Sequence, residues 1–156
     1  MLTIEQKATN ADTYKHIHRV RELINIAIKD LLDRSHKHDQ CKLESPEVEA
    51  FTEHTEKLAA STFNSPEYNE RKKLMQPALD HHYANSRHHP EHYKNGVNDM
   101  TLFDVLEMLL DWKAASERHN DGNIRKSIEV NSDPKRFNIN AQLTRIMENT
   151  ADYLGW

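Results

Sequence analysis

Histidine is unusually frequent in this chain, which contains 11 histidines among its 156 residues. One of them is followed directly by an acid, in the pair His38 and Asp39. An imidazole and a neighbouring carboxylate can bind one divalent cation together, and a second His and a distant Asp would complete such a site. Each ligand must then stand on a rigid element that aims it at a common point.

The donor types predict which ions such a site would hold. The ligands would be imidazole and carboxylate, without a thiolate. This set suits Mn, Fe, Co, Ni or Zn, and Mg where fewer His take part. The high His count favours a transition metal, so we expect one or two divalent ions as the cofactor.

A helix predicted for residues 12–32 supplies the second histidine. Its apolar residues recur at helical spacing and form one stripe along the helix. His16 lies on this stripe, whereas His18 points to nearly the opposite face. We therefore expect His16 rather than His18 to face an interior metal site.

A second helix, predicted for residues 101–119, carries the candidate late Asp. It is apolar almost all round, which is typical of a helix in the middle of a bundle, and its polar line holds Asp104, Glu107 and Asp111. Asp104 occupies the third helical position of a capping box, so Asp111 ranks above it as a metal ligand. Glu107 is expected to orient a ligand His from behind, with Asp104 as a second candidate for that role.

Most of the remaining chain is predicted to be helical as well. Ser45-Pro46-Glu47 and Asn64-Ser-Pro66-Glu67 have the residue types of helix starts, and Pro77 should kink or interrupt the second of these helices. Residues 88–92 should form a loop, residues 122–136 a less regular segment, and residues 138–154 a C-terminal helix. We expect one all-α domain over residues 1–156, a bundle of five or six helices with its core at about 12–119.

Composition excludes several classes of protein. The formal net charge is −4 and the isoelectric point is about 6.2, which argues against extended nucleic-acid binding. No apolar run approaches the length of a membrane span, and the first residues lack the apolar stretch of a signal peptide. The single cysteine suits a reducing compartment, so a cytoplasmic location is expected.

The spacing of these residues resembles that of the HD-domain superfamily of metal-dependent hydrolases. That superfamily has an early His, a His-Asp pair and a late Asp on a helical bundle. Here His16-Ile-His-Arg-Val20 and His38-Asp39-Gln-Cys-Lys42 stand in the corresponding order. Cys41 replaces the Gly of many members, while the Lys is kept. The resemblance implies that Lys42 faces a substrate phosphate.

Two histidine pairs extend this resemblance. Some members bind two or three metals and add a His on a middle helix and adjacent His in the following loop, which His81-His82 and His88-His89 resemble. The resemblance implies His82, His88 and His89 as further ligands. With Leu-Glu-Met-Leu-x-Asp-Trp-Lys-Ala, these motifs are similar over about residues 14–115 to a small uncharacterised family of the superfamily, found in phages and bacteria.

The resemblance implies a phosphohydrolase of a small phosphorylated metabolite, with a nucleotide as the leading substrate class. A metal-bound hydroxide would attack phosphorus, with Asp39 and Lys42 in catalytic roles. Arg125 or Lys126 would close over the phosphate. No Gly-rich phosphate loop is present. A homodimer through apolar helix faces and, for a phage-encoded chain, a location in the host cytoplasm are further expectations.

Two other functions remain open at this point. The extra histidines also fit a mixed-valent di-iron oxygenase, which a few HD-type relatives are. Alternatively, the chain is a non-catalytic binding protein of phage origin that a metal stabilises. Several residues also have ordinary interpretations: Arg125 and Lys126 as balancing surface charge, and His36, His54 and His119 as surface residues.

Overall fold

The computed structural model describes residues 2–59, 66–118 and 122–156. The chain divides into two compact units, residues 1–38 and residues 39–156, and each is described by itself. In the described ranges the chain contains six α-helices and three short 3-10 helices, and no strand. The predicted all-α class is therefore confirmed.

The first unit is one helix, α1 (Ile4–Lys37). Its start is fixed by a capping box, in which Thr3 and Gln6 each bond the other's backbone N–H through their side chains. This cap explains why α1 begins eight residues before the predicted helix over 12–32. No residue of α1 is buried within this unit, and most of its apolar stripe is exposed.

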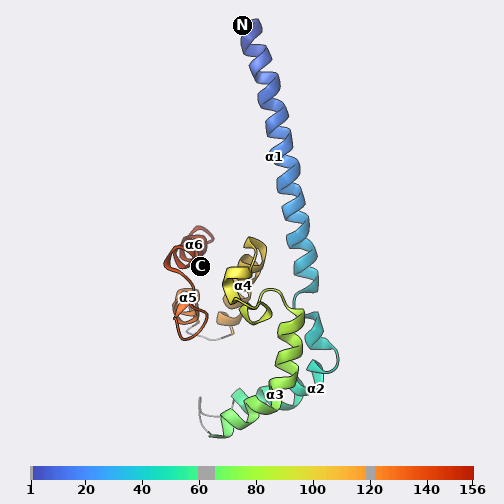
Figure 1. The fold of residues 1–156 in the computed structure, drawn as a ribbon, viewed down its shortest axis with the longest axis vertical. Coiled ribbons are helices and arrows are strands. Elements are labelled where there is room, and N and C mark those ends of the chain that lie inside the picture. The colour runs from blue at the N-terminus through green and yellow to red at the C-terminus, as the bar shows by residue number, and fades with distance from the viewer. Residues whose placement is uncertain (1, 60–65, 119–121) are drawn as a thin grey trace. The chain divides into compact units, whose positions relative to one another are not determined.

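The second unit contains the remaining elements (Figure 1). In chain order they are η1 (Gln40–Leu43), α2 (Glu47–Ala59), α3 (Pro66–Asn85), η2 (Pro90–His92), η3 (Gly96–Asp99), α4 (Leu102–Ser116), α5 (Ile124–Ser132) and α6 (Ala141–Tyr153). The helix predicted for 101–119 is α4, and the C-terminal helix predicted for 138–154 is α6. No helix in the described ranges is both long enough and apolar enough to cross a membrane.

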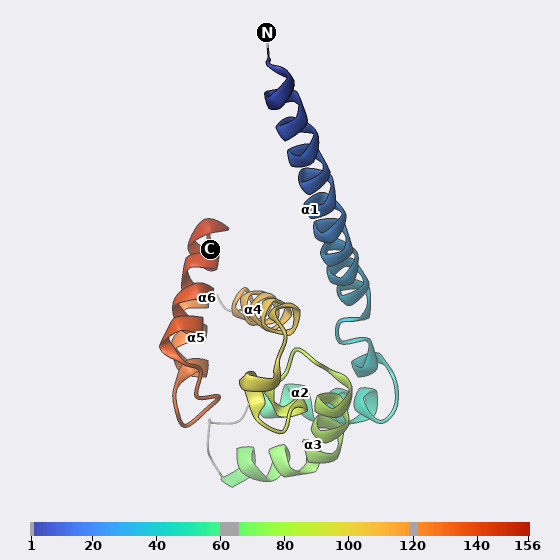
Figure 2. The same cartoon turned by 45° about the horizontal axis from the view of Figure 1, so that its top comes forward.

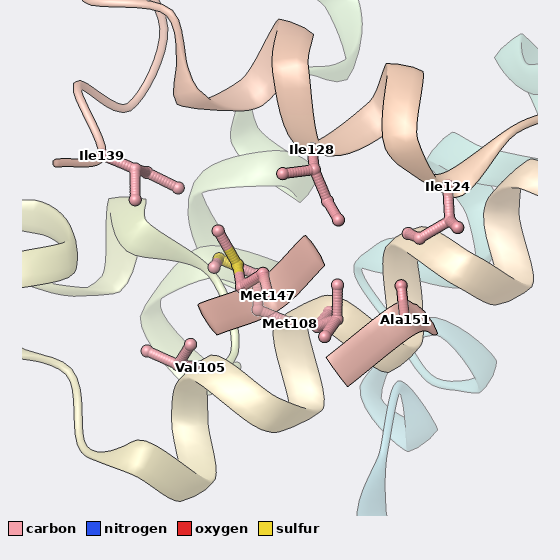
Figure 3. Packing of buried hydrophobic residues seen from close by; sticks show 8 residues of the cluster. Val105, Met108, Ile124, Ile128, Ile139, Met147 and Ala151 are labelled. Carbon is pink, nitrogen blue, oxygen red and sulfur yellow. The ribbon is translucent and has the colours of Figure 1, made fainter. Parts of the chain in front are cut away.

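The apolar core of this unit lies between α4, α5 and α6. Figure 3 shows their side chains pointing toward one another. The core residues are Val105, Met108, Leu109, Ile124, Ile128, Ile139, Met147 and Ala151. α4 packs into this core with one face, and its other residues include Glu107, which belongs to the site described below. The core therefore fixes the helix that carries Glu107.

The segment predicted to be less regular, residues 122–136, instead contains the nine-residue helix α5. Asn123 caps it, since its side-chain oxygen accepts a hydrogen bond from the backbone N–H of Arg125 at 2.8 Å. Ile124 and Ile128 stand four residues apart and both enter the core. The prediction was wrong because two apolar residues within a polar segment are enough for a helix once a core is there to receive them.

Helices α2 and α3 pack side by side (Figure 2). α3 continues through Pro77, so the proline does not interrupt the helix, and Figure 1 shows that α3 bends along its length. On α2, Glu47 and His54 are both buried and seven residues apart, hence on one face of the helix. The surface position expected for His54 was therefore wrong. His36 is exposed, as expected, and His119 lies outside the described residues.

Candidate metal centre

Asp39 is held in a tight turn at the start of the second unit. Its φ of 57° lies in the left-handed region, which Asp adopts more readily than most residues. The backbone N–H of Lys42 donates to the carbonyl of Asp39 at 2.9 Å, and η1 follows. The Lys42 ammonium also pairs with Oδ2 of Asp39 at 2.6 Å. This arrangement turns the other oxygen, Oδ1, toward α3.

Two histidine rings approach Asp39 Oδ1, and a third contacts one of them. His82 lies near the end of α3, and His88 and His89 lie in the turn that follows it. Nε2 of His82 is 2.9 Å from Nε2 of His89 and 3.5 Å from Asp39 Oδ1. Nε2 of His88 is 3.6 Å from the same oxygen. His82 and His88 are buried, and Asp39 and His89 are partly buried.

These separations match those of ligands around one ion. Two atoms that each lie about 2.1 Å from a metal are about 3.0 Å apart in octahedral geometry and about 3.4 Å apart in tetrahedral geometry. The His82–His89, His82–Asp39 and His88–Asp39 separations run from 2.9 to 3.6 Å. One donor atom from each of Asp39, His82, His88 and His89 lies within 4.8 Å of all the others. We call these four residues the histidine cluster.

The turn that carries His88 and His89 is anchored on both sides. Arg87 forms a bidentate ion pair with buried Asp104 at the start of α4, at 3.2 Å for each contact. Nδ1 of His92 lies 2.8 Å from the backbone carbonyl of Tyr83 and can donate to it. These contacts hold the turn so that His88 and His89 lie beside His82, although His82 belongs to α3 and the other two do not.

Two carboxylates lie behind the cluster. Nδ1 of His82 is 3.0 Å from Oε2 of Glu47, and Nδ1 of His88 is 3.3 Å from Oε1 of Glu107. In both rings the nitrogen that faces the carboxylate is the one that faces away from Asp39. A carboxylate accepts a hydrogen bond from an N–H at Nδ1, which leaves Nε2 with a lone pair toward the cluster.

Burial lowers the pKa of His89 and of His82, the two rings whose Nε2 atoms lie 2.9 Å apart. The pKa of His89 falls to about 3, first because the ring is buried and then because of the charges of His88 and His82. The negative charge of the Asp111 carboxylate opposes this shift, because it favours the protonated form of His89. Burial also lowers the pKa of His82. Both rings are therefore neutral at physiological pH, the form that binds a metal.

Glu47 stays ionised although it is fully buried. Burial alone would raise its pKa, but hydrogen bonds from His81 and Cys41 hold the pKa of Glu47 below its usual value. The Cys41 thiol lies 3.2 Å from Nδ1 of His82, and burial raises the pKa of Cys41. Cys41, at the position of the missing Gly, thus lies against the back of the site.

Four other predicted site residues are not part of the histidine cluster. His16 and His38 belong to residues 1–38, where His16 lies on the exposed face of α1 and the backbone N–H of His38 donates to Arg34. Arg125 pairs with Asp152 of α6. Lys126 is exposed and lines a shallow surface pocket with other residues of α5.

Two neighbours of the cluster were missed by sequence reasoning. The sequence indicates Glu47 only as an acid that favours the first turn of a helix, and Cys41 only as a departure from a motif and a sign of a reducing compartment. No local pattern distinguishes a buried carboxylate in a first turn from an exposed one. The signal lies in the contact between α2 and α3, which sequence spacing does not contain.

The fold and the cluster define an all-α protein with a candidate metal centre built from three histidines and one aspartate. The chain belongs to a family of unknown function, DUF5662, whose family model matches residues 5–153. No curated protein and no solved structure matches the chain.

Proposed function

We propose that this protein is a metal-dependent phosphohydrolase whose divalent ion is held by Asp39, His82, His88 and His89. The observation that carries the proposal is the convergence of these four side chains. Nε2 of His82 lies 2.9 Å from Nε2 of His89 and 3.5 Å from Asp39 Oδ1, and Nε2 of His88 lies 3.6 Å from the same oxygen. His82 and His88 each have one nitrogen against a carboxylate and the other directed at Asp39, and a cation is the partner that such a point favours. Three imidazoles favour a transition metal over Mg.

The surroundings of the cluster support phosphate as the group acted upon. Lys42 is partly exposed and ion-paired with Asp39, so a fixed positive charge lies at the edge of the cluster. A phosphate that reaches the ion would meet this ammonium, which would neutralise part of its charge. A bound divalent ion would supply a water of lowered pKa and polarise phosphoryl oxygens. Arg125 and Lys126 are not part of this proposal, because Arg125 is paired with Asp152 and Lys126 lines a surface pocket with other residues of α5.

Small phosphorylated metabolites are the proposed substrates, and nucleotides are the first class to test. The net charge of −4 makes a long nucleic acid a poor partner. The single cysteine suits a reducing compartment, which supports a cytoplasmic location.

Metal content tests the proposal first. We would measure bound metals by plasma mass spectrometry on wild type, Asp39→Asn, His89→Ala and the control His36→Ala, an exposed histidine of α1. Asn tolerates the left-handed turn at Asp39, so this substitution removes charge without straining the backbone. We expect transition metal in wild type and the control, and its loss in the two cluster variants. Wild type that stays free of metal after incubation with Mn, Fe, Co, Ni or Zn would contradict the proposal.

Activity tests the second half of the proposal. Metal-loaded protein would be assayed with p-nitrophenyl phosphate and a panel of nucleoside mono-, di- and triphosphates. Lys42→Gln should keep its metal but lose roughly 100-fold in turnover, whereas the exposed Lys94→Gln should match wild type. Bound iron with oxygen consumption would instead support a di-iron oxygenase. Metal that raises the melting temperature without turnover would support a non-catalytic binding protein.

A further inference from the structure

Glu47 is a carboxylate with no exposed surface, at the first residue of α2. A carboxylate removed from water is unfavourable unless hydrogen bonds replace its hydration. Its two oxygens are used separately: Oε1 lies 2.8 Å from Nδ1 of His81, and Oε2 lies 3.0 Å from Nδ1 of His82. One buried acid therefore holds two consecutive histidines of α3.

The two histidines differ in what their other nitrogens face. His82 is buried, and its Nε2 faces Asp39 and His89 in the cluster. His81 is exposed, and its Nε2 lies near the Asn85 side chain, one turn further along α3. Of the two rings that Glu47 holds, only His82 belongs to the histidine cluster.

The tautomer of His82 follows from these contacts. An ionised carboxylate can only accept, and both nitrogens of His82 face one. Nδ1 is at hydrogen-bond distance, 3.0 Å from Glu47 Oε2, whereas Nε2 is 3.5 Å from Asp39 Oδ1, so the proton belongs on Nδ1. A neutral imidazole carries one N–H, and with the proton on Nδ1 the Nε2 atom has a lone pair directed toward Asp39 and His89. The opposite tautomer would place an acceptor against the buried carboxylate and a proton inside the cluster.

We infer that Glu47 is a positioning residue for the metal centre, which fixes His82 as the Nδ1–H tautomer and holds its Nε2 lone pair toward Asp39, His88 and His89. This inference rests on the proposed metal site. Glu47 and Glu107 form a matched pair of supports, since the first holds His82 from α2 and the second holds His88 from α4. Such carboxylate–histidine contacts orient ligand rings and raise their basicity.

Two measurements test the inference on the full-length chain. The first is the long-range 1H–15N spectrum of the metal-free protein, which distinguishes the two tautomers of a neutral ring. The His82 signals would be assigned by their loss in His82→Asn. The second is titration with Co2+ of wild type, Glu47→Gln and the control Glu49→Gln, an exposed acid of the same helix. The absorption bands of bound Co2+ report the ligand geometry in each variant.

We expect the His82 proton on Nδ1 in wild type. Glu47→Gln should bind Co2+ about 10–100-fold more weakly with a changed absorption spectrum, because the amide has one acceptor and no charge for two rings. Glu49→Gln should match wild type in both affinity and spectrum. A folded Glu47→Gln that binds within twofold of wild type with an unchanged spectrum would overturn the inference.

The two measurements separate this inference from the proposed function. A wild-type protein that binds no Co2+ contradicts the proposed function, and the tautomer of His82 then decides the role of Glu47 by itself. If Glu47→Gln does not fold, the wild-type spectrum decides in the same way. A proton on Nε2 of His82 in metal-free wild type would overturn the inference in every case.

Discussion

Nδ1 of His88 lies 3.3 Å from Oε1 of Glu107, on the side of the ring opposite to the nitrogen that faces Asp39. This contact joins a residue of the turn after α3 to the middle of α4. It places Glu107 beside His88, which is one of the histidines that we propose as metal ligands. Because α4 is fixed by the apolar core, the contact also ties the orientation of His88 to the packing of that core.

Removal of the Glu107 charge should weaken metal binding while leaving the fold intact. We expect Glu107→Gln to lower the affinity for Co2+ or Mn2+ about 10–100-fold, because the His88 ring loses its charged acceptor. Isothermal titration calorimetry would measure the change. Glu117→Gln, at an exposed acid that pairs with Lys113 near the end of α4, should bind as wild type does. Equal affinity in both variants would show that Glu107 does not support the site.

Asp104 should make stability depend on acid pH. Its oxygens accept hydrogen bonds from Arg87, from the Thr101 hydroxyl and from the Thr101 backbone N–H. Burial alone would raise its pKa, but these bonds hold the pKa of Asp104 well below the unfolded value of 3.8. The ionised acid thus stabilises the fold fully above about pH 4, and this contribution declines as the pH falls below that.

Urea unfolding at several pH values would measure this contribution. At pH 7 we expect Asp104→Asn to be less stable than wild type by about 1–3 kcal/mol, the usual effect of losing a hydrogen-bonded charge. The difference should shrink toward pH 2, because the wild-type acid then begins to lose its advantage. A difference that stays constant over this range would contradict the assigned role of Asp104.

The core between α4, α5 and α6 should respond strongly to the loss of a buried side chain. Met147 on α6 is 1% exposed, whereas its neighbour Ile146 is 51% exposed. We expect Met147→Ala to lower the free energy of unfolding by about 2–5 kcal/mol through the cavity that it leaves. Ile146→Ala should change it by less than about 1 kcal/mol. Chemical denaturation would compare the two, and similar losses would show that α6 is packed by another face.

The start of α6 depends on a single cap. The side-chain oxygen of Asn140 accepts a hydrogen bond from the backbone N–H of Leu143 at 2.9 Å. Asn140→Ala should therefore destabilise the protein by about 1 kcal/mol, which a shift of the urea midpoint would detect. Asn149→Ala is the matched control, because Asn149 is exposed within the same helix and Ala is the better helix former there. A loss in the control as large as in Asn140→Ala would argue against the cap.

The sequence by itself determined the local features of this protein. Apolar spacing and capping residues are local signals, so they predicted the all-α class, the helices that became α4 and α6, and the capping box of Thr101 and Asp104. The same local patterns failed where burial decided the outcome. α5 needs the core that receives Ile124 and Ile128, and His54 is buried because its face of α2 is covered.

Only the tertiary structure decided which candidate residues meet. His82 and His89 are seven residues apart and their ring nitrogens lie 2.9 Å apart, but the turn between them is not encoded in a helical period. Glu47 is 35 residues from His82, and its role depends on how α2 lies against α3. Sequence spacing describes one element at a time, whereas a metal centre requires side chains from several elements to point at one position, which packing alone determines.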